Sequence, residues 1–171
     1  MLAAGEGQTE EPTKLTIASL MRTEVFSVPT TATVEDAVAR FLSAKTAGLP
    51  VVDEQGRARG YITDGDILRA VAGRDDSPVD LAFGLNVHPW DPEMSERVAR
   101  VMQLGVMDLA ARNVVTANVE DTVEDVAALL GSRPINKVPV LSGDVVVGVI
   151  TRGDLVRSIF GSFAGSGAKR D

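Results

Sequence analysis

The sequence contains no cysteine and only one histidine, His88. Without cysteine there can be no disulfide bond, thiolate metal site or cysteine nucleophile, which fits a reducing compartment. One histidine cannot build a metal site by itself, and no cluster of histidine and acidic residues has the spacing of metal ligands. No serine has a histidine partner in prospect, so a Ser-His-Asp triad is not expected.

Long apolar runs and positive charge are also scarce. The longest apolar runs, such as Val145–Ile150, fall far short of the roughly 18–20 residues of a membrane span. Residues 1–14 lack the basic start and apolar centre of a secretory signal. The formal net charge of −7 argues against general binding to nucleic acid or anionic lipid. The phosphate-binding motif of P-loop enzymes is absent. We expect a cytoplasmic protein that is not an enzyme and has no nucleic-acid or membrane partner.

What the sequence does contain is an internal repeat. The tetrapeptide Thr33–Asp36 recurs 89 residues later as Thr122–Asp125, and the segment Gly60–Asp66 recurs 88 residues later as Gly148–Asp154 with substitutions. The one-residue difference falls in a turn, where deletions are tolerated. The chain is therefore a duplication of one structural unit.

Each unit predicts the order β-α-β-β-α. Apolar residues at helical spacing follow a short extended piece, and two strands around a turn then lead into a closing helix. One unit of this size would bury too little surface to be stable alone, so two should pack together as a pseudo-two-fold pair in an α+β fold. The expected strands are 25–28, 49–52 and 58–62 in the first unit and 114–117, 138–141 and 145–150 in the second, and the expected closing helices are 64–71 and 152–160.

The repeat also sets the expected boundaries. We assign residues 14–72 to the first unit, 73–105 to a linker with one helix and 106–160 to the second unit. Residues 1–13 and 161–171 are rich in glycine, serine, alanine and charge, which predicts flexible tails.

Both units place a Thr-x-x-Asp motif directly after the last strand, at Thr63/Asp66 and at Thr151/Asp154. One interpretation is structural, because this pattern caps a helix, as it should at Thr33. The other is functional, because a helix N-terminus offers free N–H groups and the aspartate can accept two hydrogen bonds from a ribose diol. The residues alone leave both interpretations open.

The order and spacing of these segments resemble a tandem pair of cystathionine-β-synthase (CBS) domains, also called a Bateman module. The matching segments are Leu49–Asp53, Val138–Leu141, Gly60–Asp66 and Gly148–Asp154. The resemblance implies a non-catalytic regulatory module that senses AMP, ADP, ATP or S-adenosylmethionine in the clefts between the repeats. Mg²⁺ can accompany a bound nucleotide.

The resemblance also implies which residues would hold the ligand. The ribose would bind Asp66 and Asp154, and the phosphates would bind Thr63 and Thr151. The adenine slot would be lined by the partner repeat, with Phe26, Ala47 and Gly48 opposite Asp154, and Val115, Asn136 and Lys137 opposite Asp66.

The two sites differ in charge. Arg152 adds a donor to the second motif, whereas Asp64 in the first would repel a polyphosphate. We therefore expect the Asp154 site to bind more tightly. The resemblance further implies a homodimer and an effector protein that the sequence does not identify. The alternative is a ligand-free scaffold for dimerisation or protein interaction, in which Thr63 and Thr151 only cap helices.

Overall fold

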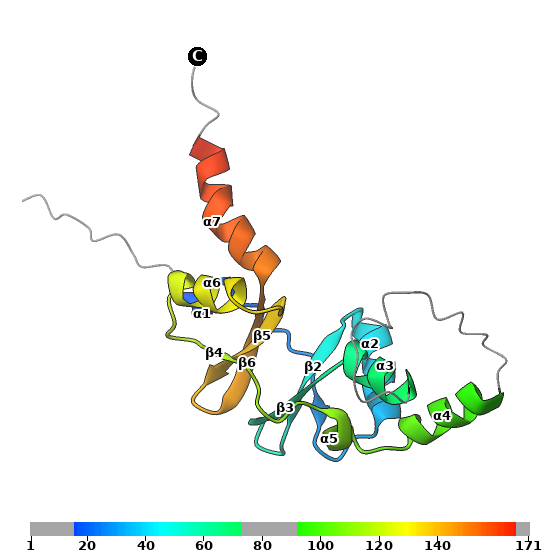
Figure 1. Cartoon of the computed structure of the whole chain (residues 1–171). Coiled ribbons are helices and arrows are strands. Elements are labelled where there is room, and N and C mark those ends of the chain that lie inside the picture. The colour runs from blue at the N-terminus through cyan, green and yellow to red at the C-terminus, as the bar shows by residue number, and fades with distance from the viewer. Residues whose placement is uncertain (1–15, 73–91, 167–171) are drawn as a thin grey trace, which may run out of the picture.

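The computed structural model describes residues 16–72 and 92–166, with side chains to residue 161. The predicted α+β fold with two β-α-β-β-α repeats is confirmed, and the repeats lie side by side (Figure 1). The first repeat comprises β1 (Val28–Pro29), α2 (Val34–Ala44), β2 (Gly48–Val52), β3 (Ala58–Thr63) and α3 (Asp64–Ala72), and the second comprises β4 (Ala117–Asn118), α6 (Val123–Gly131), β5 (Lys137–Ser142), β6 (Val145–Thr151) and α7 (Arg152–Ser166).

In the described part of the chain, three further helices lie outside the repeated pattern, namely α1 (Ile17–Leu20), α4 (Pro92–Met102) and α5 (Val106–Leu109). The helix expected in the linker is α4. The closing helix α7 continues to Ser166, into the segment expected to be a tail, because no proline interrupts its hydrogen-bond ladder. The expectations for residues 1–13 and for His88 lie outside the described residues. None of the described helices is long and apolar enough to cross a bilayer.

Each repeat builds the same three-stranded sheet. The order is β1-β2-β3 in the first and β4-β5-β6 in the second, with a parallel pair followed by an antiparallel hairpin. Both hairpin turns contain a glycine with positive φ, 76° at Gly56 and 60° at Gly143, a conformation that costs glycine little. The turn sequences thus close both hairpins despite the one-residue difference in length.

Capping interactions start the first helix of each repeat. The Thr33 hydroxyl accepts a hydrogen bond from the Asp36 backbone at 3.2 Å, and the Asp36 carboxylate accepts one from the Thr33 backbone at 2.9 Å. Thr122 and Asp125 repeat this arrangement in α6. The Thr-x-x-Asp pattern therefore fixes where α2 and α6 begin, as the sequence predicted.

Each repeat has its own apolar core. The segment that precedes the first repeat completes the core of the second, and the segment that precedes the second repeat completes the core of the first. Ile17 of α1, before the first repeat, is fully buried in the core of the second repeat with Leu130 and Ile150. Val106 of α5, before the second repeat, is fully buried in the core of the first with Ile62. Neither core is complete without the other half of the chain.

Backbone hydrogen bonds hold the exchanged segments in place. The Val106 N–H donates to the Ala32 carbonyl at 2.8 Å, and the Ile17 N–H donates to the Asp121 carbonyl at 3.2 Å. The two hairpins also meet, since the Val146 N–H donates to the Gly56 carbonyl at 3.0 Å. The relative position of the repeats is thus fixed by both backbone pairing and apolar burial.

The exchange predicts that Ile17→Ala destabilises the second repeat, although Ile17 precedes the first. Truncating a fully buried isoleucine costs about 2–5 kcal/mol. Urea unfolding should report a loss in this range, and amide hydrogen exchange should report reduced protection in β5 and β6. Glu54→Ala, at an exposed residue in the turn between β2 and β3, is the control and should change stability by less than about 0.5 kcal/mol. Loss of protection confined to β2 and β3 would contradict the exchange.

Candidate functional site

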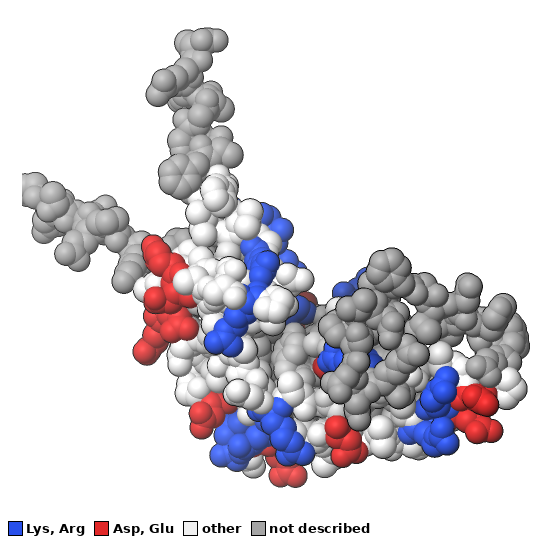
Figure 2. Space-filling model, in the orientation of Figure 1, with Lys and Arg blue, Asp and Glu red and all other residues white. Residues whose placement is uncertain are grey.

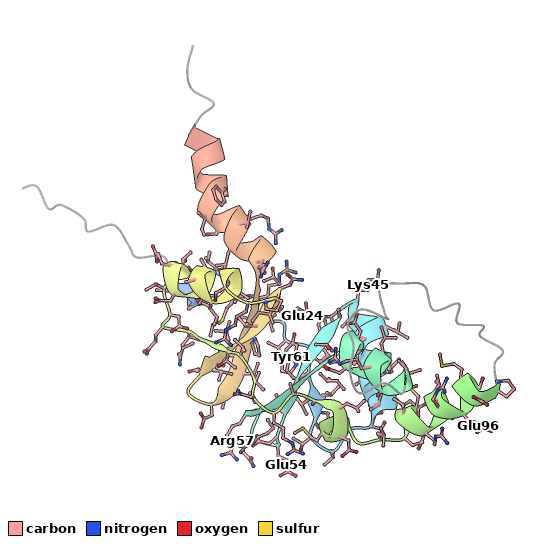
Figure 3. The ribbon with its side chains drawn as sticks, in the orientation of Figure 1. Glu24, Lys45, Glu54, Arg57, Tyr61 and Glu96 are labelled. Carbon is pink, nitrogen blue, oxygen red and sulfur yellow. The ribbon has the colours of Figure 1, made fainter. Side chains whose placement is uncertain are left out.

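A cavity of about 550 Å³ lies between the two repeats, a size that suits a small-molecule ligand. The first repeat contributes the start of β2, the end of β3 and the start of α3, and the second contributes the segments before β4 and β5 and the start of β5. Figure 3 shows Tyr61 of β3 at this junction. The residues that line the cavity are Ala47, Gly48, Tyr61, Thr63, Asp64, Asp66, Ala111, Asn113, Val114, Val115, Pro134, Ile135, Asn136, Lys137 and Pro139.

Gly48 and Tyr61 shape one wall of the cavity. A Cβ atom added to Gly48 would lie 2.7 Å from Tyr61 Cε1, so the phenol ring packs directly on the Gly48 backbone, and a larger residue would displace it. Burial raises the pKa of Tyr61 to about 12. The phenol therefore keeps its proton well into alkaline pH and can donate a hydrogen bond.

Asp66 stands at the first turn of α3 on the edge of this cavity. Its Oδ2 accepts hydrogen bonds from the Thr63 N–H at 2.8 Å and the Thr63 hydroxyl at 2.6 Å, and its Oδ1 forms an ion pair with Arg69. The side chain is 15% exposed. The carboxylate is thus held in one orientation beside the cavity.

Asp154 has the same capping contacts in the second repeat. Its Oδ2 accepts from the Thr151 N–H at 3.1 Å and the Thr151 hydroxyl at 2.7 Å. Its Oδ1 is bound by two guanidinium groups, Arg22 at 3.0 Å and Arg157 at 2.6 Å. Burial pushes the pKa of Asp154 up, but the hydrogen bonds from Thr151, Arg22 and Arg157 outweigh it and lower the pKa to about 2.

The structure brings together Asp66 and the three residues expected opposite it. Val115, Asn136 and Lys137 line the same cavity as Thr63 and Asp66. The Lys137 ammonium also donates to the Thr46 hydroxyl of the first repeat at 2.5 Å. Burial lowers the pKa of Lys137, and the positive charge of Arg22 lowers it further.

The residues expected opposite Asp154 are arranged differently. Ala47 and Gly48 line the cavity beside Asp66, and Asp154 is not among its lining residues. Phe26 packs against the core of the first repeat, with the Arg40 guanidinium carbon 5.2 Å from the centre of its ring.

Arg152 is engaged inside the second repeat. Its backbone N–H donates to the Asn136 carbonyl at 2.9 Å, and its guanidinium donates to the Arg133 carbonyl. Its Nε is buried without a hydrogen-bond partner among the described residues. Basic side chains gather near the start of α7 (Figure 2). Part of the positive charge that the sequence offers to a phosphate is therefore already bound by protein groups.

Sequence reasoning missed Arg22, Tyr61 and Ala111. Arg22 lies in the segment that enters the first repeat and pairs with β6 of the second, whereas Ala111 lies in the segment that enters the second repeat and pairs with Tyr61 of β3 in the first. Nothing in the sequence marks either pairing. The described residues contain no group of three metal-ligating side chains.

Comparison with known proteins supports this architecture. The sequence matches the CBS domain family over residues 17–73 and 106–161. It is 27% identical over 133 residues to protein MJ1426 of Methanocaldococcus jannaschii, and this alignment covers 72% of this chain and 79% of that protein. It is 26% identical over 142 residues to the chloroplastic CBS domain-containing protein CBSX2 of Arabidopsis thaliana, and this alignment covers 80% of this chain but 59% of that protein.

Solved structures share the fold. A structure of CBSX2 in complex with AMP has a TM-score of 0.65 at 22% identity and covers 86% of this chain and 98% of that one. The CBS domain pair of protein MJ0100, in complex with 5′-methylthioadenosine and S-adenosyl-L-methionine, has a TM-score of 0.61 at 21% identity and covers 87% of this chain and 98% of that one.

The contacts of Asp154 predict a stability that depends on acid pH. A carboxylate with a lowered pKa stabilises the fold above its unfolded value of about 3.9, and this contribution is lost as the pH falls toward 2. Asp154→Asn should therefore reduce the free energy of unfolding more at pH 7 than at pH 2.5. Urea unfolding of both proteins at the two pH values measures the difference, and an equal cost at both would contradict the role of the charge.

Proposed function

The chain belongs to the CBS domain family and contains two of these domains in tandem, and from this premise we propose that it is a non-catalytic regulatory module for an adenosine-containing ligand. The observation that carries the proposal is the cavity between the repeats with Asp66 at its edge. It combines an anchored carboxylate, a helix N-terminus and apolar walls, which together suit a nucleoside.

The lining offers a suitable group for each part of such a ligand. The Asp66 carboxylate would accept a hydrogen bond from the ribose diol. Val115, Ile135 and Pro139 offer apolar surface for the adenine ring. The Thr63 hydroxyl and the Lys137 ammonium would meet the 5′ substituent, which can be a phosphate.

Asp64 narrows the choice among adenosine ligands. Asp64 is the first residue of α3 and lines the cavity. Its carboxylate would repel the added negative charge of a di- or triphosphate. We therefore favour AMP or the cationic S-adenosylmethionine. The AMP complex of CBSX2 and the S-adenosylmethionine complex of MJ0100 support this class of ligand. Mg²⁺ would enter only with a polyphosphate, held by its phosphate oxygens.

A ligand between the repeats would act by shifting their packing. Its free energy of binding favours whichever arrangement closes around it. An effector protein in the cytoplasm would then recognise the altered surface.

We also propose that two chains associate through their helices. Helices α2 and α3 and helices α6 and α7 lie away from the hairpin turns (Figure 1). Leu68 of α3 and Val156 of α7, which are equivalent in the repeat, are 56% and 54% exposed, and Leu42 and Phe160 are 75% and 63% exposed. Leu68 and Val156 place an exposed apolar side chain at the same position of both repeats, so a second copy related by two-fold symmetry can pack these surfaces against each other.

The second candidate function is a ligand-free scaffold. It is favoured by the capping contacts themselves, because Thr63 and Thr151 each form the hydrogen bonds of a helix cap. In that case Asp66 would stabilise α3 and nothing more.

The variant Asp66→Asn separates the two functions. It should weaken binding of AMP by at least about tenfold, because a charge-assisted hydrogen bond is worth about 1.5–3 kcal/mol. Asp36→Asn is the matched control, since Asp36 makes the same capping contacts at α2 but does not line the cavity. The readouts are calorimetry and the rise in melting temperature with AMP or S-adenosylmethionine. No rise with either ligand would favour the scaffold.

The dimer predicts that replacing both equivalent apolar residues with charge separates the chains. Leu68→Glu with Val156→Glu should convert a species with the mass of two chains into a monomer, because each carboxylate would be buried at the interface. Light scattering coupled to size-exclusion chromatography measures the mass. Leu104→Glu, at a residue 37% exposed between α4 and α5, is the control and should leave the mass unchanged. A monomeric wild-type protein would overturn the proposal.

A further inference from the structure

Arg22 and Ala111 occupy equivalent positions in the two repeats. Arg22 exchanges two backbone hydrogen bonds with Val149, both of 2.9 Å, and Ala111 exchanges two with Tyr61, of 2.9 and 3.0 Å. Val149 and Tyr61 are themselves equivalent positions of β6 and β3. The backbone around Asp66 and Asp154 is therefore matched. The side chains differ, because Arg22 is long and cationic whereas Ala111 has only a methyl group.

This difference changes what Asp154 can bind. A carboxylate has about four lone-pair positions. In Asp154 two of them accept the N–H and hydroxyl of Thr151, and the other two accept Arg157 and Arg22. Contacts from the described residues thus fill all four positions, and a ribose hydroxyl would have to displace one of them.

Asp66 has one contact fewer among the described residues. Thr63 fills the same two positions on Oδ2, and Arg69, the equivalent of Arg157, binds Oδ1. Ala111 cannot supply the contact that Arg22 makes in the other repeat. One position on Oδ1 therefore remains for a hydroxyl group of a ligand, and this carboxylate lines the cavity of about 550 Å³.

We propose that Arg22 occupies the ribose position of the second site, so that each chain binds one adenosine ligand, beside Asp66, and not two. This inference rests on the proposed function, because it concerns the same ligand and the same pair of sites. It also reverses the preference expected from the sequence, which counted Arg152 as an added donor at the Asp154 motif. Arg22 and Arg157 instead bind the carboxylate that a ribose would need.

The position of Arg22 makes the inference testable without disturbing the core. Its side chain is 61% exposed, whereas that of Asp154 is 10% exposed, so the guanidinium reaches a sheltered carboxylate from the surface. Ala111 is also an exposed residue. Substitutions at both positions should leave the packing of the two repeats intact.

The experiment exchanges the two side chains and counts bound ligand. Calorimetric titration with AMP, and separately with S-adenosylmethionine, should give one site per chain for the wild type. Arg22→Ala should give two sites, Ala111→Arg should give none, and the double variant should give one. Asp154→Asn added to Arg22→Ala should remove the second site, and melting temperatures without ligand establish that each variant is folded.

The outcomes distinguish the inference from the function on which it rests. Failure of both the wild type and Arg22→Ala to bind either ligand overturns the proposed function and this inference with it. Two sites in the wild type, or one site in Arg22→Ala, overturns the role of Arg22 while the proposed function stands. Loss of all binding in Arg22→Ala also overturns it, because Arg22 would then contact the ligand. If Ala111→Arg does not fold, Arg22→Ala alone decides the question.

Discussion

The structure depends on one reciprocal exchange of apolar segments. Ile17 completes the core of the second repeat and Val106 completes the core of the first, and both side chains are fully buried. A unit of this size cannot bury enough surface alone, so each repeat is stabilised by residues that precede the other. The exchange carries the chain across the junction twice, and it is these crossings that set the two repeats against each other with a cavity between them.

The same crossings decide the chemistry of the junction. Each entering segment pairs with the outer strand of the opposite hairpin, which brings one side chain near the aspartate of the opposite repeat. The duplicated backbone gives both aspartates a threonine cap and an arginine one turn later, at Arg69 and Arg157. What differs is the residue that arrives from the other half of the chain. A nearly symmetric scaffold therefore surrounds its two aspartates with unequal chemistry.

Much of this arrangement could be predicted from the sequence, because it depends on local patterns. The capping pair Thr33 and Asp36 fixes the start of α2 through contacts three residues apart, and the turn around Gly56 closes a hairpin within a few residues. The slot residues Val115, Asn136 and Lys137 followed from family resemblance, and they lie along the same cavity as Asp66. The contact between Arg22 and Asp154 joins residues 132 positions apart, so no local pattern could indicate it.

The amino-acid pattern is enough to predict a duplicated β-α-β-β-α unit with an aspartate at the start of each closing helix. Hydrophobic periodicity and capping act over a few residues, and a repeat is visible without coordinates. Coordinates were needed to show that Ile17 and Val106 are each buried in the core of the opposite repeat, that Arg22 reaches Asp154, and that the described cavity opens beside Asp66. These outcomes depend on which distant segments share a buried surface, and the free energy of that burial is set by the whole fold and not by neighbouring residues.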